Sequence, residues 1–489
     1  DEWSVVLHES RESAVCGVWI AVHRFLGNHV QTGLQEPFTG FQGPPLHDCG
    51  RSLGHLSEHT FGMPNSPQEE QILVRRRGPL SGTITVPGAK NSALKLMAAT
   101  LLADGDYAIT NMPHIADVPI MSMLLESLGI EIDASQMESG VLRLRNNGTI
   151  TPVAPYELVD RIRASINVLG PLLGRCGEVR VALPGGDDFG SRPIDMHLSG
   201  LEAMGATFKF EHGDVIGVCD TLHGAEITLE FPSVGATENL LTAAVFAKGT
   251  TVIDNAAREP EIGDLAAMLV SMGASIEGIG SSTLVVQGVE RGTLRSTDHR
   301  VVPDRIQAAT YMAAVGVARG EVKLVDARVD HMDMLIKRFT EMGMRVTPLE
   351  DGVLVEAHDR LKSIDVATLP YPGIATDYKP LLVTMLSVAD GVGIVTENLY
   401  PGRFRYVEEL QRLGADIRTD GHHAVVRGKE TLSGAPVRAP DIRAGAALVV
   451  AGLAATGTTV IRDLSHIDRG YEDLVGRLRS VGADIERVK

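Results

Sequence analysis

Hydrophobic residues flank a recurring glycine along most of the chain. This tag, apolar–Gly–apolar, occurs six times, and each copy lies between a predicted amphipathic helix and a predicted strand. Its glycines are Gly129, Gly205, Gly273, Gly343, Gly414 and Gly482. Successive tags stand 68 to 76 residues apart. Six copies at a nearly constant spacing indicate an internal repeat from about residue 71 to the end of the sequence.

The rest of each unit also recurs. A run of small apolar residues predicts a buried helix that leads into a turn, and a β-branched strand follows, as at residues 107–110, 251–253 and 459–461. Apolar residues then return at intervals of three and four, as in 264–272, which predicts an amphipathic helix ending at the tag glycine in the C′ position. The predicted small-residue helices with their turns are 93–106, 240–249, 308–320, 381–391 and 444–457.

Alternating helices and strands place the chain in the α/β class. One unit is too small to bury both its faces, so six units favour two globules of three units, each with helices inside and sheets outside. The polar segment 292–304 predicts the break between them, and a cleft between two such globules is a natural ligand site. A solenoid is the alternative for long repeats, but a 70-residue α/β unit in only six copies favours closed lobes.

Composition excludes several classes of function. A net charge of −17 over 489 residues argues against nucleic acid as a partner. Four cysteines without a C-x-x-C pair are too few for a disulfide framework and fit a reducing cytosol, and no zinc-type spacing occurs. The uncharged run 444–462 is interpreted as a buried helix and strand rather than a membrane span. Residues 1–70 hold both tryptophans but no repeat, and we expect a poorly ordered extension without a secretory signal.

Polar residues at the starts of the small-residue helices break the repeat. These starts are Gly88-Ala-Lys-Asn91, Arg163-Ala-Ser-Ile166, 232–239 (PSVGATEN), Ala375-Thr-Asp377 and Asp441-Ile-Arg443. A helix N-terminus favours anions. Each polar residue alone is more often a cap or an ion pair, but Lys90, Arg163 and Arg443 would lie on equivalent ends of equivalent helices. Those ends are expected to converge on one cleft.

The stretch 183–197 lies outside the repeat and combines turn residues with charges. Gly185 and Gly186 permit a tight turn, Asp187 and Asp188 follow, and Arg192 comes soon after. A carboxyl group beside a guanidinium suits proton transfer near an anionic substrate. From this stretch alone a solvated surface turn is an equal alternative, because Gly, Pro and Asp are ordinary turn residues.

These motifs together resemble the enolpyruvyl transferase family, and among its branches the one that acts on a UDP-sugar. The resemblance covers about residues 71–489 and rests on motifs that recur in order. They are GAKN (88–91), RASI (163–166), LPGG…GSRPIDMH (183–197), PSVGATEN (232–239), NAAREPE (255–261), ATD (375–377), TDGHHAVVRG (419–428), DIRAGAALVVAGL (441–453) and HIDRGY (466–471).

The resemblance implies an inside-out α/β barrel of two lobes, residues 91–300 and residues 71–90 with 301–489. It implies transfer of enolpyruvate from phosphoenolpyruvate to the 3-hydroxyl of UDP-N-acetylglucosamine with release of phosphate, the first committed step of peptidoglycan synthesis, in the cytoplasm. The expected partners are these two substrates, with no nucleic acid, no membrane, no cofactor and no metal. A monomer or weak oligomer is expected.

The resemblance also implies roles for individual residues. Lys90, Arg192 and Arg469 would contact phosphoenolpyruvate, Asp377 would take the proton from the attacking hydroxyl, and Asp187 would be the acid that protonates C3. Arg163, Arg403 and Arg443 would add positive electrostatic potential around the anionic substrate. The remaining predicted substrate contacts are Asn91, Asp117, Pro193, Ile194, Asp195, Met196, Phe231, Pro232, Ser233, Val234, Glu259, Leu399 and Asp441.

Asp187 departs from the family pattern, because most members have cysteine at this position and a minority have aspartate. A thiol with a pKa near 8.5 is protonated at neutral pH, whereas protonating a carboxylate of pKa about 3.9 at pH 7 costs roughly 4 kcal/mol. Desolvation would raise that pKa and Arg192 would lower it. We therefore expect a lower pH optimum than for a cysteine enzyme, and insensitivity to the epoxide fosfomycin, which alkylates the cysteine.

Four alternatives remain from the sequence. The family's other branch uses shikimate 3-phosphate, but its usual NAGT-type turn is absent. Gly185-x-x-x-x-Gly190-Ser191 has the glycine spacing of a P-loop without its lysine, and no G-x-G-x-x-G follows a strand. A non-catalytic UDP-sugar-binding paralogue is left open by Asp187, although Lys90, Asp377 and Arg469 favour activity.

Overall fold

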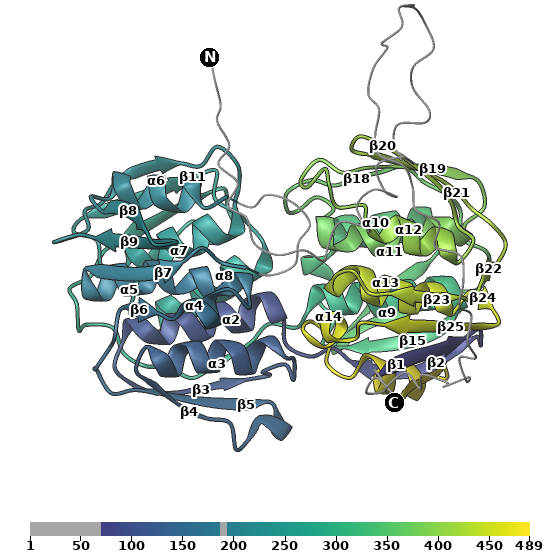
Figure 1. Ribbon diagram of the computed structural model, residues 1–489, viewed down its shortest axis with the longest axis horizontal. Helices are drawn as coiled ribbons and strands as arrows, with labels where there is room; N and C mark the ends of the chain where they lie inside the picture. The colour runs from purple at the N-terminus through teal and green to yellow at the C-terminus, as the bar shows by residue number, and fades with distance from the viewer. Residues whose placement is uncertain (1–69, 186–192) are drawn as a thin grey trace, which may run out of the picture. The chain divides into compact units, whose positions relative to one another are not determined.

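The computed structural model describes residues 70–185 and 193–489, and all of them fall in one compact unit of the chain. Their strands form six four-stranded sheets and one two-stranded sheet. Helices alternate with the strands throughout (Figure 1). The α/β prediction is confirmed.

Three of the six sheets are built mainly from residues 105–300. The first sheet has the spatial order β14 (His299–Arg300), β3 (Gly105–Thr110), β5 (Val141–Asn146), β4 (Ile130–Asp133). The second has the order β6 (Val153–Ala154), β7 (Glu178–Ala182), β9 (Asp214–Val218), β8 (Thr207–Glu211). The third has the order β10 (Glu226–Thr228), β11 (Thr250–Asp254), β13 (Thr283–Gln287), β12 (Ser275–Glu277).

The other three sheets take their strands from both ends of the described chain. The fourth sheet has the spatial order β16 (Arg345–Leu349), β17 (Gly352–Ala357), β15 (Gly320–Val325), β2 (Leu80–Thr85). The fifth has the order β18 (Val366–Ala367), β19 (Val392–Thr396), β21 (His423–Arg427), β20 (Asp416–Asp420). The sixth has the order β23 (Pro436–Arg438), β25 (Thr458–Arg462), β1 (Gln71–Arg75), β26 (Asp484–Val488). The two-stranded sheet is β22 (Leu432–Ser433) and β24 (Ala455–Thr456).

Two kinds of helix connect the strands. The internal helices are α2 (Lys90–Ala99), η1 (Thr100–Leu102), η3 (Arg163–Val168), α5 (Leu169–Cys176), α7 (Val234–Ala244), α9 (Arg305–Ala318), η5 (Thr376–Tyr378), α11 (Lys379–Val388) and α13 (Ile442–Gly452). The others are α3 (Asp117–Ser127), η2 (Met137–Ser139), α4 (Tyr156–Val159), α6 (Asp195–Ala203), α8 (Pro260–Ser271), η4 (Val329–His331), α10 (Asp333–Glu341), α12 (Tyr406–Arg412), α14 (Ser465–Asp468) and α15 (Leu474–Ser480).

Each four-stranded sheet has one parallel and two antiparallel pairings. In four of these sheets the parallel pair is the strand before an internal helix and the strand after it, as with β10 and β11. Parallel neighbours need a crossover connection, which the internal helix provides. The expected helix and strand in 444–462 are α13 and β25, so that interpretation is confirmed.

The chain crosses twice between the two groups of sheets. β2 pairs in parallel with β15, more than 200 residues later, and β14 pairs in parallel with β3. The two crossing segments lie side by side, with an antiparallel bridge between Gly88 and Pro303. β1 lies between β25 and β26 in the last sheet, so the purple strands in Figure 1 sit among green and yellow ones.

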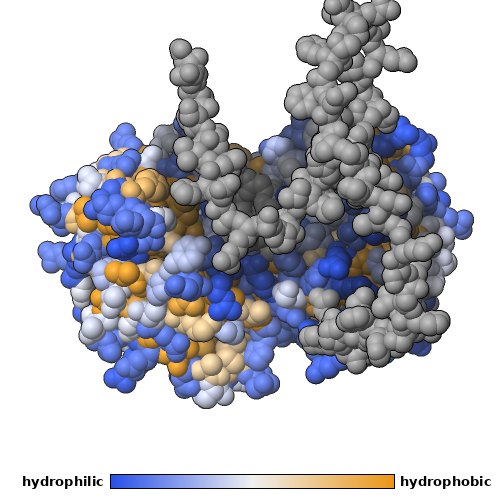
Figure 2. All heavy atoms as spheres, viewed as in Figure 1, coloured by the Kyte–Doolittle hydropathy of each residue, from blue (hydrophilic) through white to orange (hydrophobic). Residues whose placement is uncertain are grey.

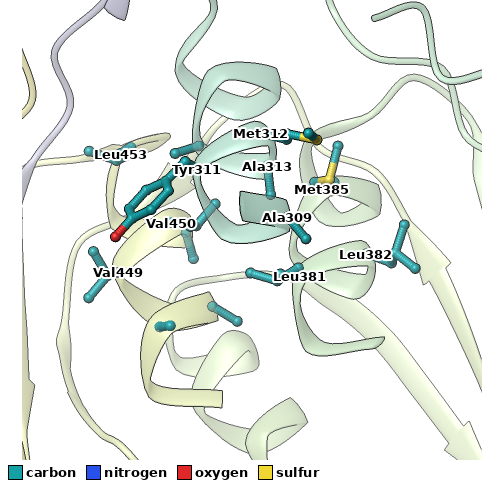
Figure 3. Packing of buried hydrophobic residues seen from close by; sticks show 14 of the residues in the cluster. Ala309, Tyr311, Met312, Ala313, Leu381, Leu382, Met385, Val449, Val450 and Leu453 are labelled. Atoms are coloured by element: carbon teal, nitrogen blue, oxygen red, sulfur yellow. The ribbon is translucent and has the colours of Figure 1, made fainter. Parts of the chain in front are cut away.

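Two separate hydrophobic cores fill the insides of these groups. One core extends from Ala89 to Val301 in sequence and the other joins 72–86 to 306–485. We call the regions around them the first lobe and the second lobe. In the second lobe α9, α11 and α13 pack against one another with small and medium side chains such as Ala309, Leu381 and Val450 (Figure 3). Burying three helices together requires small side chains on all faces, which explains the Ala-rich runs.

The six tag glycines all adopt positive φ, between 85° and 109°. Each follows the C-cap residue of a helix, as Gly273 follows Met272 at the end of α8, so the predicted C′ placement is confirmed. The internal helices begin earlier than predicted. For example, α9 begins at Arg305 rather than 308 and α13 at Ile442 rather than 444. Their polar starts therefore belong to the first helical turn.

Two of the tag glycines give a matched test of this backbone requirement. A Cβ on Gly414 would meet nothing within 4 Å, so Gly414→Ala should cost only the left-handed backbone energy, about 1–2 kcal/mol. A Cβ on Gly129 would lie 2.2 Å from the Thr149 carbonyl oxygen. Thermal unfolding should show a clearly larger fall in Tm for Gly129→Ala. Equal falls would contradict the role of the Thr149 contact.

No helix within 70–185 and 193–489 is both long enough and apolar enough to cross a membrane. The face shown in Figure 2 mixes hydrophilic and hydrophobic residues over both lobes.

Candidate active site

A cavity of about 770 Å³ is lined by residues from both lobes. All six groups of internal helices contribute their first turns to it: α2, η3 before α5, α7, α9, η5 before α11, and α13. The residues at these starts are Lys90, Asn91, Arg163, Ala164, Val234, Gly235, Arg305, Ile306, Thr376, Asp377, Ile442 and Arg443. The helix starts therefore do converge, as the pattern of polar residues predicted. The positive ends of the helix dipoles meet at this cavity and favour an anionic ligand.

Side-chain charges strengthen this preference. The cationic residues in the lining are Lys90, Lys95, Arg163, Arg305, Arg403, Arg443 and Arg469, and the acidic ones are Asp117, Glu238, Glu259, Glu261 and Asp377. In a chain of net charge −17, a cavity with more cations than anions is a local exception. Such a cavity suits phosphate and carboxylate groups.

Lys90 and Arg469 share one buried carboxylate. Asp117 at the start of α3 lies 2.8 Å from Lys90 Nζ through Oδ2 and accepts a hydrogen bond from Arg469 Nε at 2.8 Å through Oδ1. Asp117 is 1% exposed. Burial lowers the pKa of Lys90, and the Asp117 carboxylate opposes that shift. The arrangement fixes two cations from different lobes side by side at the cavity wall.

Asp377 is held between two arginines. Arg403 Nη1 donates to its Oδ1 at 2.8 Å and Arg443 Nε donates to its Oδ2 at 3.1 Å. Burial alone would raise the pKa of Asp377, but the attraction of Arg403 and Arg443 outweighs it and holds the pKa below the usual range. Asp377 is therefore ionised at every pH near neutrality, and it lines the cavity as a hydrogen-bond acceptor.

A third cluster joins the lobes at the same cavity. Arg305 Nε donates to Glu261 Oε1 at 3.0 Å, and Arg305 Nη1 donates to the Tyr378 hydroxyl at 3.1 Å. Arg305 and Glu261 are both more than 90% buried. Burial raises the pKa of the neighbouring Glu259, and Arg305 opposes that shift. This cluster positions the carboxylates of the NAAREPE motif.

Most residues that the sequence predicted for the site line this cavity. They are Lys90, Asn91, Asp117, Arg163, Pro193, Met196, Phe231, Pro232, Ser233, Val234, Glu259, Asp377, Leu399, Arg403, Arg443 and Arg469. Ser233 also caps α7 by accepting from the Ala236 N–H.

Three predicted residues lie elsewhere. Ile194 is buried in the first core and Asp195 begins α6 with an exposed side chain. Asp441 is the N-cap of α13, where its Oδ1 accepts from the Arg443 and Ala444 N–H groups. It thus orients Arg443 instead of lining the cavity. Asp187 and Arg192 lie outside the described residues.

Several lining residues were not predicted, among them Lys95, Asn167, Glu238 and Arg305. Burial raises the pKa of Glu238 to about 7, opposed by Lys95, whose Nζ lies 3.4 Å from Glu238 Oε1. A signal was available for two of them, because Lys95 stands one helical turn after Asn91 on a predicted helix and Glu238 lies within the PSVGATEN motif. Arg305 gave none, since it stands between the polar segment 292–304 and the predicted helix 308–320.

Asp117 offers a direct test of the shared carboxylate. Asp117→Asn should leave Lys90 and Arg469 without their anion, which for a buried pair costs about 3–5 kcal/mol in unfolding free energy. We also expect a higher KM for an anionic substrate, since both cations lose their orientation. Chemical denaturation and steady-state kinetics would measure this. The control is Asp106→Asn, whose carboxylate is 83% exposed and should matter little.

Comparison with known proteins decides the family. A family model described as EPSP synthase (3-phosphoshikimate 1-carboxyvinyltransferase) matches residues 74–478. The chain belongs to this family of enolpyruvyl transferases. The resemblance inferred from the motifs is thereby confirmed.

Curated relatives place the chain more finely within the enolpyruvyl transferases. It is 51% identical over 420 residues to a UDP-N-acetylglucosamine 1-carboxyvinyltransferase of Mycolicibacterium paratuberculosis, covering 86% of this chain and 100% of that protein. It is 51% identical over 419 residues to the protein of the same name from Mycobacterium leprae, covering 86% and 99%.

Solved structures of enolpyruvyl transferases share the fold. NikO from Streptomyces tendae, described as an enolpyruvyl transferase, matches with a TM-score of 0.77 and 25% identity over 86% of this chain and 99% of that chain. EPSP synthase from Acinetobacter baumannii matches with a TM-score of 0.67 and 19% identity over 86% and 100%. At 19% identity the second match supports the fold alone.

Proposed function

We propose that this enolpyruvyl transferase moves the enolpyruvyl group of phosphoenolpyruvate to the 3-hydroxyl of UDP-N-acetylglucosamine and releases phosphate. The observation that carries the proposal is identity of about half over nearly the whole length of relatives that bear this activity in their names. The cation-rich cavity is the physical counterpart, because both substrates carry phosphate groups and one also carries a carboxylate.

Different residues at the cavity would bind the two substrates. Lys90 and Arg469, joined by Asp117, would hold phosphoenolpyruvate, with Arg192 as a third cation. Arg163 and the start of α7 at Ser233 and Val234 would receive the nucleotide part of the acceptor. The helix N-termini around the cavity add partial positive charge toward both anions.

The reaction needs one base and one acid. The acceptor oxygen attacks C2 of phosphoenolpyruvate, its proton passes to Asp377, and C3 takes a proton from Asp187 to give a tetrahedral adduct. Asp187 then takes a proton back from C3 as phosphate leaves C2, which gives the enolpyruvyl ether, and Asp377 passes its proton to the departing phosphate or to solvent. Arg403 and Arg443 keep Asp377 ionised, so its carboxylate can receive the proton as the oxygen attacks, although the two arginines also lower its basicity.

The same family model covers the branch that uses shikimate 3-phosphate, so the acceptor must be tested. Purified protein would be given phosphoenolpyruvate with each acceptor in turn while phosphate release is measured. We expect turnover with UDP-N-acetylglucosamine only. Turnover with shikimate 3-phosphate would overturn the proposal, and tight binding of the UDP-sugar without turnover would favour a non-catalytic paralogue.

A place in peptidoglycan synthesis follows from the proposed product, and synthesis of a UDP-linked precursor belongs in the cytoplasm. The proposal requires no nucleic acid, membrane, metal or redox cofactor, since carboxylates and cations supply the proton transfers and charge stabilisation.

Fosfomycin provides an independent chemical test. Asp187 stands where the epoxide would meet a cysteine thiolate, and a carboxylate is a far poorer nucleophile. We expect no time-dependent loss of activity with fosfomycin, whereas Asp187→Cys should be inactivated and gain one adduct by mass spectrometry. An adduct on the loop of the unaltered protein would refute this prediction.

A further inference from the structure

A lysine and a glutamate form a fully buried ion pair behind the cavity wall. Lys379 begins α11 and Glu397 directly follows β19. Lys379 Nζ lies 2.8 Å from Glu397 Oε2, and both side chains are 0% exposed. Neither residue lines the cavity among the described residues. Two charges removed from water at this cost need a reason beyond stability, because well-packed apolar side chains would often stabilise the fold as well.

Glu397 organises two segments that do line the cavity. Its Oε1 accepts from the N–H groups of Leu399 and Tyr400 at 2.8 and 3.1 Å. Oε1 also accepts from the Thr368 hydroxyl at 2.7 Å, and Oε2 accepts from the Thr376 hydroxyl at 2.8 Å. The carboxylate therefore fixes the start of the 398–403 segment and the residue just before Asp377.

Lys379 fixes the other end of the same segment. Its ammonium donates to the Arg403 carbonyl oxygen and lies 3.9 Å from the centroid of the Phe404 ring. Burial lowers the pKa of Lys379 to about 8, opposed by the attraction of Glu397. The Arg403 side chain turns back to Thr376 Oγ1 at 3.2 Å and to Asp377 Oδ1 at 2.8 Å.

These contacts connect the ion pair to Asp377, the proposed base, both through Thr376 and through Arg403. We propose that Lys379 and Glu397 are positioning residues that hold the 398–403 segment, and through it Arg403, so that Asp377 stays ionised and aimed into the cavity. The inference rests on the proposed function of Asp377. The pair touches no substrate in this scheme and acts only through Arg403 and Thr376.

Removing the positive charge of Lys379 alone should disturb the contacts that hold Asp377. In Lys379→Met, Glu397 becomes a buried anion without its cation, and Arg403 is a cation bonded to the same Thr376 hydroxyl as Glu397. Competition for Arg403 would weaken its bond to Asp377. Among the described residues, the other charged or titratable groups near the pair are Asp441, the N-cap of α13, and Tyr406 of α12. Arg443 keeps its own bond to Asp377.

The expected signature combines a rate loss with a change in pH dependence. Lys379→Met should lower kcat by at least about tenfold, since small displacements of a catalytic group are costly. Because Asp377 loses part of the stabilisation of its charged form, its pKa should rise, and the fall of activity on the acid side should begin at a higher pH than in the unaltered enzyme. Lys379→Met with Glu397→Gln removes both charges and should recover most of the lost kcat.

A buried polar residue on the same helix supplies the control. Ser387 of α11 is fully buried and its hydroxyl donates to the Val383 carbonyl, so Ser387→Ala should lower Tm slightly without changing kcat or the pH profile. An unchanged pH profile in a folded Lys379→Met variant, or a double variant as impaired as the single one, would overturn the inference.

Hydrogen exchange gives a readout that does not depend on the reaction. Amide exchange in 398–403 should rise in Lys379→Met but not in Ser387→Ala, because Glu397 holds the Leu399 and Tyr400 N–H groups. Absence of phosphate release from the unaltered protein would count against the proposed function alone. Unchanged exchange in 398–403 would count against the positioning role alone.

Discussion

Replacing Asp377 by asparagine is expected to lower kcat by about 10²–10⁴, the range that a positioned acid or base contributes. Asparagine keeps the shape and one acceptor oxygen but cannot take the proton of the acceptor hydroxyl at neutral pH. Binding of UDP-N-acetylglucosamine should persist, because the helix starts and the other cations of the cavity remain. Single-turnover kinetics and calorimetric binding would separate the two effects.

The same substitution should destabilise the fold. Arg403 and Arg443 are each 4% exposed and share the Asp377 carboxylate, so Asp377→Asn leaves two buried cations with one neutral acceptor. Loss of a buried partner costs about 3–5 kcal/mol. Asp390→Asn on the surface is the control, since its carboxylate is 79% exposed. A folded Asp377→Asn enzyme within tenfold of normal kcat would exclude Asp377 as the base.

The second large effect is on the dependence of rate on pH. Asp187 must carry a proton to act as the acid, and its protonated fraction rises as the pH falls toward its pKa. Asp377 remains ionised over the same range, because its two arginines hold its pKa below the usual value. The rate should therefore rise as the pH is lowered from 8, by up to about tenfold per pH unit, until the pKa of Asp187 is reached.

Asp187→Cys should remove this slope. A thiol with a pKa near 8.5 is already protonated below pH 8, so the rate should be nearly flat from about pH 6 to 8. Profiles of kcat/KM for both proteins, with Asp187→Ala as the inactive reference, would show the difference. Identical profiles for the aspartate and cysteine forms would mean that another group supplies the proton, with Asp188 the adjacent candidate.

The sequence predicted which helices end in a left-handed residue and which helices are buried on all sides. A helix that must end in a left-handed residue needs glycine, and all six tag glycines have positive φ. A helix packed on all sides needs apolar side chains all round, and α9, α11 and α13 have them, with many alanines in α9 and α13. Charged residues at the starts of such helices gain nothing from the core, so Lys90, Arg163 and Arg443 were identifiable as site candidates.

Tertiary structure decided which residues distant in sequence become partners. Asp117 with Arg469, and Glu261 with Arg305, are pairs between the two lobes, and no period along the chain relates them. In the sequence, nothing distinguishes Lys379 from other helix residues or Glu397 from other residues that follow a strand. Their importance comes from complete burial and from sharing Arg403 and Thr376 with Asp377.

The sequence by itself thus determined the α/β units and their helix ends, because these depend on spacing and on side-chain size within one unit, and the motifs shared with the family indicated most of the cavity lining. The pairing of β2 with β15, the meeting of six helix starts at one cavity and the ionised state of Asp377 were decided only by the folded chain. Those properties depend on distances and burial, which arise when separate units pack together and exclude water.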